Sequence, residues 1–177
     1  MNTKYLSVIL LFLVNYAVAQ VKHTVTKSTI TFQIKNLGFN TSGNISGLQG
    51  DILFDGANLD ASHINASVDV STINTDNNMR DEHLRSDSFF DATKYPQITI
   101  KSVSLKHKGG DNYTGQFNLT IKDKTHLVEI PFTYIATGGT ASFNGTFKIK
   151  RSDFGIGGSS MVLSNDATVT IDVETSK

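Results

Sequence analysis

Apolar and polar residues alternate along most of this 177-residue chain, and this two-residue period constrains the fold more than any other feature. The segment from Thr29 to Lys35 is typical, because single polar residues separate Ile30, Phe32 and Ile34. Successive side chains of a β-strand point to opposite faces, so the pattern places apolar side chains on one face and polar ones on the other. The chain is therefore predicted to consist mainly of half-buried β-strands.

The alternation recurs often enough to predict about eight strands, separated by glycine-containing breaks or short polar stretches. Antiparallel strands of similar length favour a closed or nearly closed barrel, because closure removes exposed sheet edges. An open two-sheet sandwich is the alternative. The strand positions are Ile30–Ile34, a weaker glycine-rich stretch Ile45–Phe54, Ile64–Val70, Ile98–Ile100, Phe117–Ile121, Val128–Tyr134, Phe143–Ile149 and Val169–Val173.

One stretch, residues 77–87, departs from the alternation and predicts a short helix of about two turns. Asp81 and Arg85 lie four residues apart, and Asp76 or Asn77 is suited to cap the start. The expected fold class is therefore all-β: an antiparallel eight-stranded barrel with one short helix.

Composition excludes several functional classes. The chain has 16 basic and 16 acidic residues, so its formal net charge of zero does not favour a nucleic acid partner. It has no cysteine, which excludes disulfides, thiolate metal sites and a lipoprotein anchor. Its five histidines show no metal-ligand spacing. The sequence therefore predicts no metal site and no cofactor.

The N-terminal residues 1–19 have the pattern of a secretory signal peptide. Lys4 precedes an apolar run from Leu6 to Val14, which is too short to span a membrane. Ala17-Val18-Ala19 then provides the small residues that a signal peptidase recognises. We expect cleavage before Gln20 and a periplasmic or secreted protein without a stable membrane span.

The densest group of polar side chains, residues 80–87, allows three interpretations. Asp81 and His83 are the candidates for an enzymatic acid–base pair, although no nucleophile is evident beside them. Arg80 or Arg85 is suited to hold an anionic head group, because a guanidinium donates two parallel hydrogen bonds. In the third interpretation the charges pair with one another and close the end of the barrel.

Several motifs resemble those of the YceI-like family. The block RDEHLRSDSFFD begins at Arg80 and is followed by KYPQI at Lys94–Ile98. LTIKDKT at Leu119–Thr125 resembles the family's hairpin, with Asp123 where glycine is usual, and RSDFGIG at Arg151–Gly157 resembles its late R-x-D-F-G motif. The likeness covers about residues 24–175. It implies an exported, lipocalin-like barrel that binds polyisoprenoids or other long-chain amphiphilic lipids.

We therefore expect residues 20–177 to form a lipid-binding barrel without catalytic residues. Its ligand would be a polyisoprenoid, an isoprenoid quinone or a fatty-acid-like lipid, and a homodimer is possible. Small inward residues at Ala66, Gly115 and Gly145 leave room for an elongated guest. An enzyme acting on a lipid head group and a barrel filled by its own side chains are the alternatives. The expected apolar contacts are Ile30, Phe32, Ile34, Val68, Phe117, Leu119, Ile130, Phe132, Phe143 and Phe147, and the expected head-group contacts are Arg80, Arg85 and Tyr95.

Overall fold

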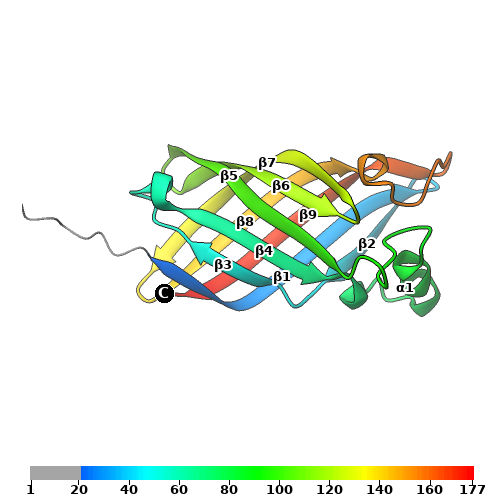
Figure 1. Cartoon of the computed structure of the whole chain (residues 1–177), viewed down its shortest axis with the longest axis horizontal. Helices are drawn as coiled ribbons and strands as arrows, with labels where there is room; N and C mark the ends of the chain where they lie inside the picture. Colours follow the sequence, from blue (N-terminus) through cyan, green and yellow to red (C-terminus); the bar gives the residue numbers. More distant parts are fainter. Residues whose placement is uncertain (1–20) are drawn as a thin grey trace, which may run out of the picture.

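One antiparallel sheet of nine hydrogen-bonded strands forms the wall of the molecule in a computed structural model that describes residues 21–177 (Figure 1). The predicted signal peptide lies outside the described residues. The strands are β1 (Lys22–Asn36), β2 (Phe39–Ile45), β3 (Gln49–Leu53), β4 (His63–Asp69), β5 (Gln97–Gly109), β6 (Asn112–Ile121), β7 (Lys124–Thr137), β8 (Thr140–Lys150) and β9 (Leu163–Ser176).

The sheet closes on itself because β1 pairs with β9 along one edge and with β2 and β3 along the other. Ile30 is opposite Ile45 on β2, and Lys22 is opposite Leu53 on β3, in one continuous register. β2 and β3 are therefore two parts of one interrupted strand, and the barrel has eight strand positions. This confirms the predicted eight-stranded barrel and excludes the open sandwich.

The interrupted strand begins earlier than the sequence predicts, at Phe39. Its first part, FNTSGNI, carries mostly polar residues, so it lacks the alternation that identified the other strands. Gly47, with φ of 73°, separates the two parts. A left-handed backbone at this point is inconsistent with continued strand geometry.

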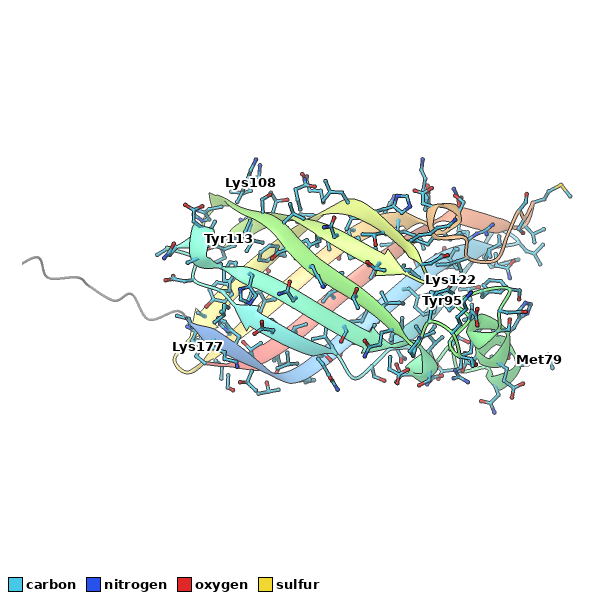
Figure 2. The ribbon with its side chains drawn as sticks, viewed as in Figure 1. Met79, Tyr95, Lys108, Tyr113, Lys122 and Lys177 are labelled. Carbon is cyan, nitrogen blue, oxygen red and sulfur yellow. The ribbon has the colours of Figure 1, made fainter. Side chains whose placement is uncertain are left out.

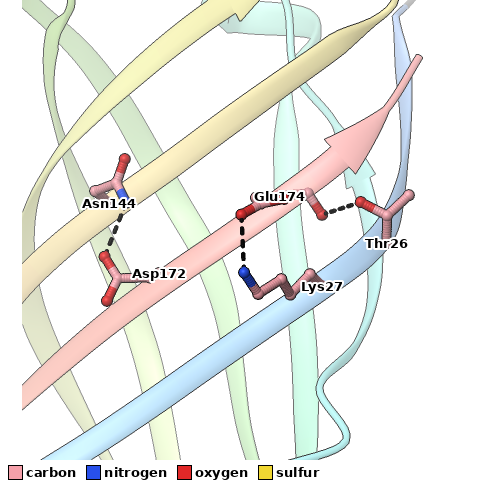
Figure 3. A network of polar contacts seen from close by, with 5 residues as sticks. All are labelled: Thr26, Lys27, Asn144, Asp172 and Glu174. Atoms are coloured by element: carbon pink, nitrogen blue, oxygen red, sulfur yellow. Dashed lines mark hydrogen bonds and ion pairs between the residues drawn. The ribbon is translucent and has the colours of Figure 1, made fainter.

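Polar side chains on the outer face join the strands at the seam where the barrel closes (Figure 3). The Lys27 ammonium on β1 contacts the Glu174 carboxylate on β9 at 3.4 Å, and the Thr26 hydroxyl donates to the Glu174 carbonyl. On the other side of β9, the Asn144 amide donates to the Asp172 carboxylate at 2.8 Å. The polar residues of the alternating pattern thus face solvent, and the apolar residues between them face the interior.

The predicted helix is α1 (Asn78–Arg85), and the Asn77 side chain caps it by accepting from the Arg80 backbone N–H. Short 3-10 helices also occur at η1 (Leu59–Ala61), η2 (Val70–Thr72) and η3 (Arg151–Phe154). In Figure 1, α1 and the β8–β9 connection lie at one end of the barrel, while the C-terminus and the start of β1 lie at the other. The two ends of the barrel are closed differently.

The end opposite α1 is filled by an aromatic cluster, which consists of His23, Phe54, Tyr113, Phe132, Tyr134 and Phe143. Phe54 is fully buried at its centre, with ring centroids 5.2 Å from Tyr113 and 5.4 Å from Phe143. Figure 2 places Tyr113 at this end and Met79 of α1 at the other. Most of these contacts are edge-on, which is a favourable geometry for aromatic rings. Aromatic side chains therefore fill this end of the interior.

Candidate ligand-binding cavity

The interior near α1 is not filled by side chains and contains a cavity of about 430 Å³. Cavities of about 300 to 1,000 Å³ with mainly apolar linings are typical of sites for small organic ligands. A barrel filled throughout by its own side chains, one of the alternatives, is therefore not what the structure shows.

The walls of the cavity are rows of inward side chains on neighbouring strands. Phe32 on β1, Val169 on β9 and Phe147 on β8 lie side by side in register. Ala66 on β4 is opposite Ile100 on β5 and completes part of another wall. Phe32, Ile100 and Val169 are only partly buried although they point inward, because they face open space rather than other side chains.

Only some of the predicted apolar contacts line the cavity. Phe117, Ile130, Phe132 and Phe143 are absent from the cavity wall and belong to the buried core that includes the aromatic cluster. The space beside Gly115 is occupied by the Phe117 ring, so this glycine adds no room for a ligand, whereas Ala66 does face the cavity. The predicted contacts that do line the cavity are Ile30, Phe32, Ile34, Val68, Leu119, Phe147 and Arg80.

The cavity opens at the α1 end. Four of its lining residues are exposed, namely Asn36, Arg80, His83 and Ser160. They come from the end of β1, from α1 and from the β8–β9 connection, which surround the same end of the barrel. The cavity is therefore a pocket with a polar mouth, an apolar wall and a closed aromatic base.

Asp81, Thr75 and Arg80 form a hydrogen-bonded group beside the mouth. The Asp81 carboxylate is 4% exposed and accepts from the backbone N–H of Thr75 at 2.9 Å and from its hydroxyl. The Arg80 guanidinium donates to the Thr75 hydroxyl at 2.7 Å and to its carbonyl at 2.6 Å. Within residues 21–177, no hydrogen bond joins Asp81 to His83, the two groups of the enzymatic interpretation.

The third interpretation of residues 80–87, in which the charged side chains pair with one another, is wrong in this respect. Among the described residues, none of them forms an ion pair with another. Asp81 instead reaches back to Thr75, and Arg85 donates to the Ile73 carbonyl at 2.7 Å. The helix is therefore attached to the preceding loop by single charged side chains that bind neutral backbone and hydroxyl groups.

Two predicted head-group contacts lie away from the cavity wall. Arg85 donates to the Ile73 carbonyl, and its Nε atom is buried without a hydrogen-bond partner among residues 21–177. Tyr95 is half-buried and has the Lys94 ammonium 5.1 Å from its ring centre. Of the three predicted polar contacts, only Arg80 lines the cavity.

Sequence reasoning assigned no role to Arg151, which is 5% exposed and contributes to the cavity wall. Its guanidinium donates to the carbonyl oxygens of Ser164, Ile156, Gly158 and Leu163 at 2.6–3.2 Å. These bonds fix the β8–β9 connection over the barrel end. The only signal in the sequence was its position at the start of the R-x-D-F-G motif.

Leu84 and the segment after α1 were not predicted to face a ligand, and His83 was considered only as one half of the enzymatic acid–base pair. His83, Leu84, Phe89 and Phe90 all line the cavity, and the His83 ring packs edge-on against Phe89 at 4.8 Å. Because these residues lie outside any strand, the two-residue period gives no information about the direction of their side chains.

At the opposite end, burial lowers the pKa of His23 and raises the pKa values of Tyr113 and Tyr134. The histidine is held by Thr175, whose hydroxyl lies 2.9 Å from Nδ1, and by the Phe54 carbonyl, 3.1 Å from Nε2. The shifts have the same cause: an aromatic surrounding disfavours the charged form of each group. The base of the cavity therefore favours uncharged side chains.

The described residues 21–177 contain no cluster typical of a metal site and no helix suited to span a membrane. No group of three or more histidine or acidic side chains is arranged to hold a metal ion in this part of the chain. No helix there is long and apolar enough to cross a membrane.

Comparison with known proteins identifies the family. Residues 21–175 match the sequence family described as "YceI-like domain". A UPF0312 protein of Vibrio cholerae is 31% identical over 136 residues, which cover 73% of this chain and 72% of that protein. The crystal structure of BcnA from Burkholderia cenocepacia is similar with a TM-score of 0.79 and 26% identity, covering 83% of this chain and 95% of that one.

A polyisoprenoid binding domain from Saccharophagus degradans, implicated in plant cell wall breakdown, has the same fold, with a TM-score of 0.70. It is 15% identical, and the match covers 88% of this chain and 97% of that one. Fold, motifs and relatives agree: this chain belongs to the family of proteins with a YceI-like domain.

Proposed function

We propose that this protein is an exported, non-enzymatic carrier or sequestering protein that holds one long-chain amphiphile in its barrel. The ligand class is a polyisoprenoid, an isoprenoid quinone or a fatty-acid-like lipid. The observation that carries the proposal is the apolar cavity of about 430 Å³, closed at its base and open at a polar mouth. The structural neighbour described as a polyisoprenoid binding domain supports the same ligand class.

The shape of the cavity matches a ligand with one apolar chain and one polar end. Each buried methylene group contributes about 0.8 kcal/mol, so ten of them contribute about 8 kcal/mol before the entropic cost of binding. A net binding free energy of about 8 kcal/mol would correspond to a dissociation constant of about 1 μM, and the entropic cost makes the affinity from ten buried methylene groups alone weaker than this. Selectivity would then depend mainly on the length and bulk of the chain.

Arg80 is the proposed contact for the polar end of the ligand. It is exposed at the mouth, and its guanidinium is already oriented by Thr75. His83 lies at the same mouth and adds a second polar group. The periplasm or the exterior is the proposed location, on the basis of the signal peptide predicted over residues 1–19.

Ala66→Phe tests the proposal, because it places a ring where the wall faces open space. Asn65→Phe is the matched control, since the preceding residue of β4 points to the opposite face. Binding of fluorescent fatty acids and prenyl alcohols of increasing length is measured for both variants and for the natural protein. Ala66→Phe should weaken binding of the longest probes about tenfold or more, and Asn65→Phe should not.

Native mass spectrometry of protein purified from its own host gives an independent readout. We expect a co-purifying lipid that organic extraction removes. Recovery of empty protein with no affinity for any prenyl or acyl probe would overturn the proposed function, as would equal probe binding by the natural protein and Ala66→Phe.

A further inference from the structure

Exposed apolar side chains gather beside the polar mouth of the cavity. Large hydrophobic residues are exposed at eight positions among the described residues, and five of these belong to segments at the α1 end. Leu37 lies in the β1–β2 turn and Phe39 directly follows that turn. Met161 and Val162 lie in the β8–β9 connection, and Met79 lies on α1. Figure 2 shows Met79 at the α1 end of the molecule.

Four of these residues, Leu37, Phe39, Met161 and Val162, form what we call the apolar lip. A hydrogen bond from the Leu37 backbone N–H to the Val162 carbonyl, 2.9 Å long, joins the two loops. The lip residues are 51% to 105% exposed. Their chain neighbours Asn36 and Ser160 line the cavity, so the lip borders its opening.

Leu37 is an unfavourable residue for its turn. It has φ of 52° and is followed by Gly38 with φ of 83°. A hairpin turn with two such residues strongly prefers asparagine, aspartate or glycine at the first position, because a Cβ atom crowds the left-handed backbone. A leucine there gains no burial in return, since it is 67% exposed. Neither folding nor solubility accounts for this residue, which indicates a role in contact with something outside the chain.

The lip segments carry almost no charge. Residues 35–50 and 154–165 contain no aspartate or glutamate, and Lys35 is their only basic residue. A surface that combines exposed apolar side chains with so few charges is suited to the interface of a lipid bilayer, where charged groups are costly to insert. It offers little electrostatic complementarity to a protein partner.

We propose that the apolar lip docks on the surface of a lipid bilayer, and that the cavity exchanges its ligand with the membrane there. The second part of this inference rests on the proposed function, because it requires an apolar ligand whose reservoir is the membrane. The first part does not depend on it. Attachment driven by apolar burial is largely independent of salt and does not require anionic lipids.

The test compares two triple variants in a vesicle-flotation experiment. Leu37→Asn/Phe39→Ser/Met161→Ser removes three lip residues, and its Leu37→Asn change also suits the turn, so the fold should be retained. Val103→Ser/Leu127→Ser/Ile135→Ser removes the three large exposed apolar residues of the described chain that lie on the barrel strands β5 and β7, outside the lip. The vesicles are neutral phosphatidylcholine, studied at low and high salt.

The natural protein and the barrel-strand variant should float with the vesicles, and the lip variant should partition at least about tenfold less. Salt should change none of these values more than about twofold. Equal partitioning of the two triple variants, or no partitioning of the natural protein, would overturn the inference. A lip variant that changed the sedimentation mass but not vesicle partitioning would do so as well, by identifying the lip as a contact between copies.

Binding of a fatty acid probe in solution, without vesicles, separates this inference from the proposed function. If none of the three proteins binds a prenyl or acyl probe, the proposed function fails, while flotation still decides whether the lip docks. The other outcome is that the natural protein and both triple variants bind the probe equally in solution, while the lip variant alone takes it up from vesicles about tenfold more slowly. This result would support both the proposed function and the docking of the lip on the membrane.

Discussion

The ring of Phe32 lies over Gly43, its cross-strand partner on β2, at a position that a larger residue would occupy. A Cβ atom at residue 43 would stand 2.5 Å from Cζ of Phe32 and 2.6 Å from Cγ2 of Thr75. The missing side chain lets the aromatic ring lie along the barrel wall. Gly43 therefore contributes to the shape of the cavity although it is not part of the lining.

Gly43→Ala should destabilise the protein by about 1 to 3 kcal/mol, because the added carbon meets a ring, a methyl group and the Asn74 carbonyl together. Urea unfolding followed by circular dichroism measures the change. Gly139→Ala is the control, since no atom of the non-adjacent residues described by the structure lies within 4 Å of the position its Cβ would take. Equal stability of the two variants would contradict the proposed contact between Phe32 and residue 43.

Arg151→Lys should lower the free energy of unfolding by about 2 to 4 kcal/mol. The lysine ammonium cannot reproduce the planar set of donors that binds four carbonyl groups, so buried acceptors lose their partners. Chemical denaturation measures the loss, and limited proteolysis within residues 157–162 should become faster. Lys148→Gln, at an exposed position on β8, should leave both values unchanged.

Asp81→Ala should destabilise the protein by about 2 kcal/mol, because the backbone N–H and the hydroxyl of buried Thr75 lose their acceptor. Hydrogen exchange of the α1 amides should also become faster, since this contact attaches the helix to the preceding loop. Glu82→Ala, an exposed neighbour on the same helix, is the control. A loss of stability no larger than the control's would show that the carboxylate does not anchor α1.

Stability should fall as the pH is lowered through the range in which histidine titrates. Burial lowers the pKa of His23 more than its bond to the Phe54 carbonyl raises it, and the charge of Lys177 lowers it further. The unfolded chain, with an ordinary histidine pKa of 6.5, therefore binds a proton more tightly than the folded protein. The contribution of neutral His23 is fully present above this value and is lost as the pH falls from 6.5 toward the folded pKa.

Urea unfolding between pH 7.5 and pH 5, a range of about 2.5 units in which carboxylates stay ionised, measures this dependence. His23→Gln should reduce the slope of stability against pH, whatever its effect on stability at pH 7. His107→Gln, at an exposed position near the end of β5, should retain the natural slope. A slope unchanged by His23→Gln would assign the dependence to another group.

Local pattern was sufficient to predict the strands, the barrel and the helix with its cap. The two-residue period depends only on neighbours in the chain, and Asn77 caps α1 through a contact three residues away. The strand that was placed least accurately, β2, is the one whose residues do not alternate. The family, too, was identified from contiguous motifs.

The sequence by itself thus determined which side chains point into the barrel, but not where along the barrel axis they lie. Phe132 on β7 and Phe147 on β8 both point inward, yet Phe132 packs in the aromatic cluster at the closed end and Phe147 lines the cavity. Register between strands and their tilt fix that height, and both depend on pairings distant in sequence, such as β1 with β9. The hydrogen-bond partners of Asp81 and Arg151 were likewise not evident from the sequence, because they depend on how the loops at the barrel end are arranged in space. The cavity is therefore a property of the tertiary structure, built from side chains whose direction the local period had already decided.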